Sequence, residues 1–335
     1  MKIIFLNDNI DSHSAVYQPK VVERMREVLP ELDENIYTRN DIVSDPEKFS
    51  DTEAIFSTWG MSVFTEQEIE TCLPRLKCVF YAAGSVQSFA RPFLNRGIKV
   101  MSAWTANAIP VAEYSAAQIV LANKGFFGLS RLLAQKKLEE ADEIKYLYHG
   151  NFRERVGLLG CGMIGSHVAE LLQQYELEVV VFDLFMSDEK ADRLKVKKCS
   201  LEEIFSTCSV VSNHLANNAA TKGMLKYEYF SSMRPYATFI NTGRGAQVIE
   251  PDLVRALTER PDLTAILDVT YPEPAELSHP FYTLPNCFLT PHIAGNIVPN
   301  EQVRMIEYML EEYKRYFSGE PCKYEVTLKM LETMA

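Results

Sequence analysis

Three polar residues, Arg244, Glu273 and His292, each follow a short apolar run in the second half of the chain. A histidine can exchange a proton near neutral pH, and a neighbouring glutamate can orient its ring and favour its charged form. An arginine stays charged and offers paired, planar donors to a carboxylate or a carbonyl oxygen. Because the carboxyl ends of parallel strands share one edge of a sheet, we expect these residues to converge on one reaction centre.

Each of the three residues also has a simpler explanation. His292 could be a hydrogen-bonded loop histidine, Glu273 an exposed acid in a Tyr-Pro-Glu-Pro turn, and Arg244 an ordinary surface or interdomain cation. His214, at the end of a predicted strand, is as compatible with packing as with a place near a cofactor. The other histidines are interpreted as structural or exposed: His13, His149, His167 and His279.

A glycine-rich turn separates a predicted strand from a predicted helix. Val156–Leu159 is a short apolar run, and Leu177–Phe182 is a second, β-branched run that ends on Asp183. Glycines at this spacing allow a sharp turn, let a pyrophosphate approach the backbone and let the helix pack against the sheet. The start of the helix offers unpaired N–H groups to phosphate. The predicted cofactor contacts in this turn are Gly160, Gly162, Met163, Ile164 and Gly165.

Asp183 predicts the type of dinucleotide. A carboxylate at this point can accept hydrogen bonds from both hydroxyls of the adenosine ribose, and it would repel the 2′-phosphate of NADP. Lys190 and Arg193 come only later in the chain. The glycine-rich turn with Asp183 therefore predicts NAD. Combined with Arg244 and His292, it indicates hydride transfer between NAD(H) and the carbonyl/alcohol pair of an anionic substrate.

Strand-like and helix-like patterns alternate around these residues, which predicts an α/β fold with mostly parallel sheets. In the first 103 residues we expect strands at Lys2–Leu6, Ala54–Ser57, Cys78–Ala82 and Lys99–Ser102, and helices at Lys20–Leu29 and Glu66–Cys72. After Asp183 we expect strands at Val210–Leu215, Thr238–Asn241, Thr264–Val269 and Cys287–Thr290, and helices at Leu201–Phe205, Tyr229–Met233, Pro251–Arg260 and Asn300–Phe317. Between them, Ala108–Phe127 predicts a long, mostly buried helix and Arg131–Lys145 a solvated one.

The composition limits the classes of protein that the chain can represent. With 335 residues and 47% hydrophobic content, it should form two domains with ample cores. The net charge of −11 argues against binding to nucleic acid. Seven cysteines without a CxxC pair, and an N-terminal apolar run of only four residues, predict a reduced, cytoplasmic protein with no metal site and no membrane segment.

The chain resembles the D-isomer-specific 2-hydroxyacid dehydrogenases in a series of ordered motifs. These are Asn107–Glu113 at the start of the long helix, Gly160–Ala169 at the cofactor turn, Asn213–Leu225, the arginine loop Ile240–Gly245, Leu267–Pro274, and the histidine motif Thr290–Gly295. The resemblance implies two doubly wound, Rossmann-like domains with parallel sheets and an active site in the interdomain cleft. A discontinuous, flavodoxin-like substrate domain would comprise residues 1–103 and 298–335, and an NAD-binding domain residues 104–297. The helix of residues 108–127 would build a homodimer.

The resemblance also implies further site residues. The substrate carboxylate would meet Asn107, Arg244 and the backbone of Ala83, Gly84 and Ser85. Asp268 would approach the nicotinamide, and further cofactor contacts would come from His214, Leu215, Thr242, Gly243 and Ala294. The loop Gly84–Phe89 lacks the family's common G-x-D-x-[IV]-D pattern, Ala216 replaces a proline, and Thr270 replaces an aromatic residue. The change in the loop leaves the identity of the substrate open.

The implied activity is the NAD-dependent interconversion of a small 2-oxoacid and its D-2-hydroxyacid. Glyoxylate, hydroxypyruvate and 3-phosphohydroxypyruvate are candidate oxoacids. An alternative on the same fold is an NAD(H)-sensing, corepressor-like interaction protein, against which the complete trio of Arg244, Glu273 and His292 argues. Formate oxidation is disfavoured, because a formate enzyme would be expected to have an amide at the position of Glu273.

Overall fold

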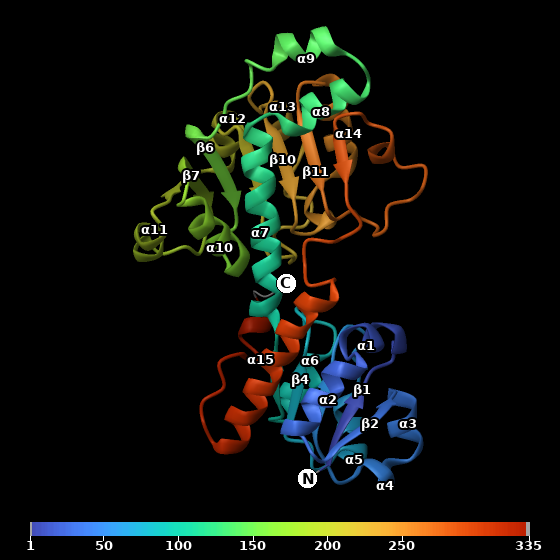
Figure 1. Ribbon diagram of the computed structural model, residues 1–335. Helices are drawn as coiled ribbons and strands as arrows, with labels where there is room; N and C mark the ends of the chain where they lie inside the picture. Colours follow the sequence, from blue (N-terminus) through green and yellow to red (C-terminus); the bar gives the residue numbers. More distant parts are fainter. Residues whose placement is uncertain (1, 333–335) are drawn as a thin grey trace. The chain divides into compact units, whose positions relative to one another are not determined.

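The computed structural model describes residues 2–332, which form two compact units. The terminal unit contains the chain up to Asn107 and from Asn296 onward, and the central unit is Ala108–Gly295. Met1 and residues 333–335, which belong to the predicted discontinuous domain, lie outside the described residues. Each unit has a largely parallel sheet covered by helices (Figure 1), so the predicted α/β fold with two Rossmann-like halves is confirmed.

Within residues 2–332, the terminal unit has a six-stranded sheet in the order β13-β5-β4-β3-β1-β2. Its strands are β1 (Lys2–Leu6), β2 (Leu32–Tyr37), β3 (Thr52–Ser57), β4 (Cys78–Tyr81), β5 (Lys99–Ser102) and β13 (Glu325–Val326). The pairing is parallel except between β13 and β5. The sequence did not predict β2, because this strand lies at the sheet edge and its LDENIY sequence is largely polar and only partly buried.

Helices cover both faces of this sheet and bury two separate cores. One core involves α3 (Arg39–Ser44), α4 (Pro46–Phe49), α5 (Glu66–Cys72) and α6 (Ala90–Asn95), and the other involves α1 (Ile10–Val16), α2 (Pro19–Val28) and α15 (Pro299–Ser318). Neighbouring residues of β3 serve opposite faces, since Ile55 belongs to the first core and Phe56 to the second. The predicted C-terminal helix is confirmed as α15.

The central unit has, in the described chain, a seven-stranded parallel sheet in the order β12-β11-β10-β9-β6-β7-β8. Its strands are β6 (Phe152–Leu159), β7 (Glu176–Phe182), β8 (Lys197–Lys198), β9 (Val210–Asn213), β10 (Thr238–Asn241), β11 (Thr264–Leu267) and β12 (Cys287–Leu289). The chain enters at β6, extends outward to β8, and then crosses to β9 on the other side of β6. The order therefore reverses between β6 and β9, the position at which open α/β sheets bind ligands.

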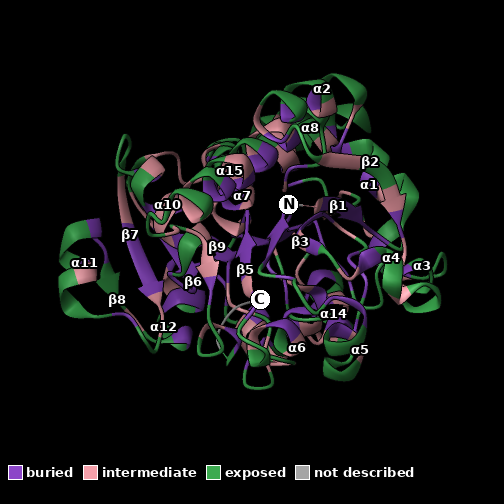
Figure 2. Cartoon of the chain, turned by 90° about the horizontal axis from the view of Figure 1, so that it is seen from below, coloured by how far each residue is buried: buried purple, intermediate pink, exposed green. Residues whose placement is uncertain are grey.

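The helices of the central unit also form two layers. One face is covered by the later part of α7 (Trp104–Asn123), α10 (Met163–Leu172) and α11 (Asp188–Leu194), and the other by α12 (Leu201–Thr207), α13 (Tyr227–Ser231) and α14 (Glu250–Glu259). Figure 2 shows the strands largely buried, whereas α11 carries many exposed residues. No helix in residues 2–332 has both the length and the apolar character needed to cross a membrane.

The long helix has different boundaries from those predicted. Residues 108–127 were expected to form one helix, but α7 begins at Trp104 and ends at Asn123. Gly125 then adopts φ +73° before α8 (Phe126–Ala134), and α9 (Leu138–Ile144) follows. A Cβ atom at Gly125 would lie 2.4 Å from the ring of Tyr148. The helix thus ends at a left-handed glycine beside which Tyr148 leaves no room for a side chain. The prediction of one helix followed the apolar pattern and passed over this glycine.

Two buried histidines make the stability of the fold dependent on pH. Burial lowers the pKa of His13 to about 4 and that of His214 to about 3, from an ordinary value of 6.5. As the pH falls below 6.5, the unfolded chain binds protons that the folded protein does not. The free energy of unfolding therefore decreases. Each histidine should lower the free energy of unfolding by about 2 kcal/mol between about pH 7.5 and about pH 5.

Urea unfolding at the two pH values measures this effect. The His13→Phe variant should lose about half of the pH dependence, because only the His214 contribution remains. An equal free energy of unfolding for the wild type at both pH values would contradict the prediction.

Candidate active site

The structure brings Arg244, Glu273 and His292 together at the carboxyl edge of the central sheet. They follow β10, β11 and β12, respectively. His292 Nδ1 lies 2.5 Å from Glu273 Oε1, and the two side chains are 46% and 37% exposed. Since a carboxylate can only accept, this contact assigns the proton to Nδ1 and leaves Nε2 for another partner. Burial lowers the pKa of Arg244, and the nearby charge of Glu273 opposes that shift.

A single buried carboxylate shapes the loop that carries His292. Asp268, which is 2% exposed, accepts hydrogen bonds from Ile293 N at 2.8 Å, Ala294 N at 2.9 Å and Thr290 Oγ1 at 2.6 Å. His292 itself has φ +54°, a left-handed conformation that costs a non-glycine residue of order 1–3 kcal/mol. The three bonds on either side of His292 hold it in that conformation. The structure shows that Asp268 positions this loop. Its contact with nicotinamide stays a prediction.

A buried amide network fixes the arginine loop. Asn213 Nδ2 donates to Asn241 Oδ1 at 3.0 Å and to Gln247 Oε1 at 2.7 Å. The same two oxygens accept from Gly243 N at 3.0 Å and Arg244 N at 3.1 Å. The sequence did not predict these three amides as positioning residues. Asn241, which ends a predicted strand, was the signal available for part of the network.

The arginine loop contacts the loop of Glu273. A Cβ atom at Gly245 would lie 2.1 Å from the carbonyl carbon of Thr270, so only glycine allows this approach. Next to it, Tyr271 N donates to Glu250 Oε1 at 2.8 Å, and His279 Nε2 lies 3.4 Å from Glu250 Oε2. Burial raises the pKa of Glu250. The loops that carry Arg244 and Glu273 are therefore positioned by one another.

The Gly245→Ala substitution should destabilise the protein. The added methyl group overlaps backbone atoms, and such overpacking costs about 1–3 kcal/mol. Urea unfolding should show this loss. Gly162→Ala is the comparison variant: a Cβ atom there meets nothing within 4 Å, so its loss of stability should come only from the poorer N-cap that alanine makes and should be smaller than that of Gly245→Ala. Equal stability of Gly245→Ala and the wild type would contradict the contact.

The glycine turn has the geometry that a pyrophosphate requires. Gly160 has φ +86°, and a Cβ atom there would lie 2.8 Å from His214 O. At Gly165 a Cβ atom would lie 2.1 Å from Gly160 O, so helix α10 can pack close to the strand only with glycine. Open space surrounds Gly162, the N-cap of α10, which has no side-chain cap for its free N–H groups. Met163 is exposed and Ile164 is half-buried at the start of that helix.

Asp183 lies directly against this turn. Its Oδ2 accepts from Cys161 N at 2.7 Å, and its Oδ1 accepts from Phe185 N at 2.8 Å. Each oxygen keeps a lone pair for a ribose hydroxyl, and the residue is only half-buried. The open space at Gly162 and the carboxylate of Asp183 together fit an NAD molecule.

His214 is enclosed between two hydroxyl groups. Its Nε2 lies 2.9 Å from Ser212 Oγ, and its Nδ1 lies 3.3 Å from Thr242 Oγ1. The lowered pKa keeps this ring neutral, and both nitrogens have partners. Leu215 is tied to the amide network, because its carbonyl oxygen accepts from Gln247 Nε2 at 2.8 Å. These contacts fit the packing interpretation of His214, and the cofactor contacts of His214, Leu215 and Thr242 stay predictions.

In the terminal unit, the loop after β4 presents free backbone donors. Within residues 2–332, the N–H groups of Gly84 and Ser85 donate to no protein acceptor. Ser102 Oγ holds the loop by donating to Ala83 O at 2.9 Å and Gly84 O at 2.7 Å. Asn107 Nδ2 would lie 3.4 Å from a Cβ atom at Gly84. Such a loop can accept an anionic group.

Comparisons with known proteins identify the family. The model of the D-isomer specific 2-hydroxyacid dehydrogenase NAD binding domain matches residues 117–294, more than half of the chain. The protein YoaD of Bacillus subtilis (strain 168), which carries a 2-hydroxyacid dehydrogenase name, is 35% identical over 162 residues, covering 48% of this chain and 46% of that protein. A D-3-phosphoglycerate dehydrogenase of Archaeoglobus fulgidus is 27% identical over 237 residues, covering 71% of this chain and 44% of that protein.

This chain therefore spans about half the length of the curated relatives that it matches. Among solved structures, the apo form of D-mandelate dehydrogenase from Rhodotorula graminis superposes with a TM-score of 0.79 at 18% identity and covers 97% of each chain, which shows a shared fold. The match to an NAD binding domain model confirms both the resemblance derived from the sequence motifs and the prediction of NAD as cofactor. The chain belongs to the D-isomer specific 2-hydroxyacid dehydrogenase family.

Proposed function

We propose that the protein is an NAD-dependent enzyme that interconverts a small 2-oxoacid and its D-2-hydroxyacid. The observation that carries this proposal is the His292–Glu273 contact beside Arg244, at the carboxyl edge of a sheet with an NAD-type glycine turn. A proton carrier, an acid that orients it and an anion-binding group are the residues that carbonyl reduction requires.

His292 is the proton carrier in this proposal. NAD, when bound, supplies the hydride chemistry. In the reducing direction, protonated His292 gives its Nε2 proton to the carbonyl oxygen as that oxygen gains negative charge, and in the oxidising direction the neutral ring takes the proton back. Glu273 holds Nδ1–H throughout, so it fixes the ring and stabilises the imidazolium ion. The exposure of both side chains gives the proton a path to solvent.

Arg244 binds the substrate carboxylate in this proposal. The guanidinium group offers paired donors, and the amide network fixes the backbone from which it extends. The free N–H groups of Gly84 and Ser85 are a second set of donors suited to a carboxylate. Glyoxylate, hydroxypyruvate and 3-phosphohydroxypyruvate carry the carboxylate and carbonyl that these groups address, and they are the proposed substrate class.

We also propose a homodimer formed through residues 108–127 and a cytoplasmic location. Leu121 and Phe126 are large apolar side chains that are exposed in this region, and association of two chains would cover them. The cysteines of the described chain are all free thiols, which suits a reducing compartment. Analytical ultracentrifugation should give the mass of two chains. A single-chain mass at micromolar protein would reject the dimer.

A screen of NADH oxidation across a panel of 2-oxoacids, repeated with NADPH, tests the proposed activity. We expect turnover of at least one oxoacid, with NADH preferred over NADPH by about 100-fold or more, because Asp183 would face the additional phosphate. Absence of turnover on the whole panel would reject the proposal. If NAD(H) then promoted self-association of the protein, the corepressor-like alternative would be favoured.

A further inference from the structure

The fold brings Lys190 to the glycine turn, although 29 residues separate it from Cys161 in the sequence. Its Nζ donates to Cys161 O at 2.5 Å, and the residue is half-buried. Lys190 lies in the first turn of α11, where its N–H donates to Ser187 Oγ at 3.2 Å. Helices α10 and α11 follow the neighbouring strands β6 and β7 (Figure 1), so both begin at the carboxyl edge that carries the turn. Lys190 is therefore part of the cofactor turn in space.

Lys190 and Asp183 hold the same residue of this turn from its two ends. Asp183 Oδ2 accepts from Cys161 N at 2.7 Å, while the ammonium group of Lys190 donates to Cys161 O. The same carbonyl oxygen also accepts from Ser166 Oγ at 2.9 Å. Gly162, which follows directly, is surrounded by open space. A carboxylate and an ammonium group therefore flank the position at which the dinucleotide is expected to approach the backbone.

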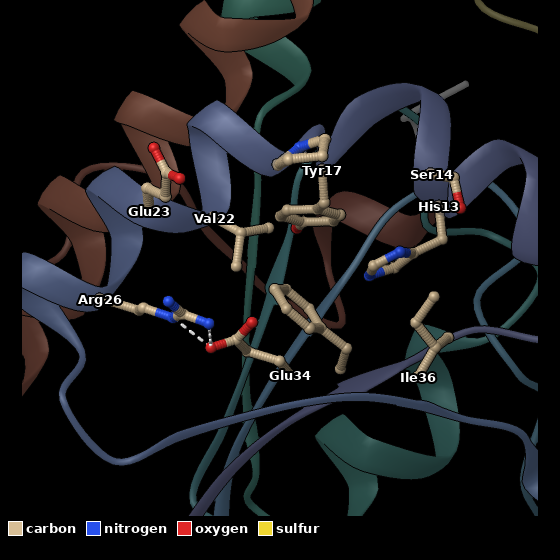
Figure 3. A pocket seen from close by; sticks show the side chains of 10 residues that line it. His13, Ser14, Tyr17, Val22, Glu23, Arg26, Glu34 and Ile36 are labelled. Carbon is tan, nitrogen blue, oxygen red and sulfur yellow. Dashed lines mark hydrogen bonds and ion pairs between the residues drawn. The ribbon is translucent and has the colours of Figure 1, made fainter.

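The ammonium group of Lys190 has binding capacity that the protein does not use. An ammonium group has three N–H donors, and one of them is used in the turn. Within residues 2–332, Lys190 forms no ion pair with a carboxylate. By contrast, Lys198 of the next strand, β8, pairs with Asp188. Arg26, beside a hollow lined by residues of α1 and α2, pairs with Glu34 (Figure 3). Lys190 therefore keeps its charge and two donors for a group that approaches the turn.

The chemistry of this acid and base points to the adenosine ribose of the cofactor. NAD and NADP differ by one phosphate on the ribose 2′-oxygen, and a carboxylate at the position of Asp183 addresses the ribose hydroxyls. A phosphate monoester carries about −1.5 to −2 charges at neutral pH. Lysine binds phosphate as a point charge, whereas a carboxylate repels it. Asp183 and Lys190 therefore act in opposite directions on the same group of the dinucleotide.

We propose that Lys190 is a second specificity-determining residue for the dinucleotide: its ammonium group binds the 2′-phosphate of NADP(H) once Asp183 no longer excludes it. In the wild type, Asp183 sets the preference for NADH. The proposal rests on the NAD site of the proposed function, and binding alone tests it, without turnover of an oxoacid. If Lys190 only stabilised the turn through Cys161 O, its loss would affect NADH and NADPH alike. The two dinucleotides therefore separate these roles.

Fluorescence titration of the full-length protein with NADH and with NADPH, in the absence of an oxoacid, tests the proposal. Asp183→Ser removes the repelling carboxylate and should bind NADPH at least about tenfold more tightly than the wild type does. Addition of Lys190→Met to this variant should weaken NADPH at least about tenfold and NADH at most about threefold. An unchanged NADPH affinity on addition of Lys190→Met, or an equal loss for both dinucleotides, would overturn the proposal.

Lys195→Met is the matched control, made in the same Asp183→Ser background. Lys195 is exposed at the C-terminal end of α11, and in the described part of the chain it also lacks an ion pair. Its substitution removes the same charge from the same helix and should leave the NADPH affinity unchanged. An equal loss of NADPH affinity from both lysine substitutions would indicate a general effect of charge and would overturn the assignment to Lys190.

Circular dichroism checks the fold of each variant. If Asp183→Ser does not fold, Asp183→Asn takes its place, because asparagine keeps the size of the side chain and one acceptor oxygen while removing the charge. A wild-type protein that bound neither dinucleotide would overturn the NAD site together with this proposal. NADH binding by the wild type, without a selective loss of NADPH on addition of Lys190→Met, would overturn this proposal alone.

Discussion

The His292→Ala variant should turn over an accepted 2-oxoacid at least ~10²-fold more slowly than the wild type, measured as kcat for NADH oxidation. Removal of the imidazole takes away the only group for which the structure shows both a free ring nitrogen and a carboxylate partner at this edge of the sheet, within residues 2–332. The side chain of His292 is 46% exposed, so its loss opens no core cavity and the protein should remain folded.

His167→Ala is the matched control for this prediction. His167 also lies beside a glutamate, with Nδ1 3.4 Å from Glu170 Oε2, but this pair is on the outer surface of helix α10. The same chemical change there should leave kcat within about twofold of the wild type. Full turnover by His292→Ala, with the control also unchanged, would remove His292 from the reaction.

The Arg244→Ala variant should have a lower kcat/KM, equivalent to a loss of ~2–5 kcal/mol of transition-state stabilisation. The reason is that the substrate carboxylate would enter the site without its charged partner. Most of the loss should be in KM, since the proposed contact exists before the reaction begins. Arg244→Lys keeps the charge but not the paired donors, so its kcat/KM should lie between those of the wild type and the alanine variant.

Arg255→Ala is the control for the arginine substitution. Arg255 pairs with Glu259 at 2.9 Å on the exposed side of helix α14 in the same unit, so its removal should leave kcat/KM unchanged. If Arg244→Ala bound and turned over the oxoacid as the wild type does, the proposed carboxylate contact would be wrong.

The features of the central unit that the sequence predicted correctly are those determined by neighbouring residues. Gly160 has the turn conformation, Gly162 the open space and Gly165 the close helix–strand approach that their spacing predicted. Strand β10 was predicted with its observed bounds, because Phe239 and Ile240 form an apolar pair that runs directly into the glycine-flanked turn 242–245. Pro251 lies in the first turn of α14, as expected.

Two predicted strands of the central unit are two residues shorter in the structure, and the difference has a chemical reason. The predicted strands 210–215 and 264–269 end as β9 at Asn213 and β11 at Leu267. His214 and Asp268 follow directly and are buried, but their side chains hydrogen-bond to neighbouring loops: His214 to Thr242, and Asp268 to the backbone of the His292 loop. Hydrophobic periodicity does not distinguish a strand from the buried start of a loop.

The remaining features depend on contacts between distant segments. The network that joins Asn213, Asn241 and Gln247 spans two strands and a loop, and its pairing is visible only in three dimensions. The same is true of the three donors on Asp268. Motifs thus located Arg244 and His292, whereas the groups that position them required the structure.

The stereochemical fate of a labelled hydride tests the central claim most directly. An accepted 2-oxoacid other than glyoxylate is reduced with NADH that carries deuterium at both positions of nicotinamide C4, and the product is analysed for the position of the label and for its configuration at C2. Our account predicts deuterium at C2 of the D-2-hydroxyacid. An L-2-hydroxyacid, or a product without deuterium at C2, would contradict it.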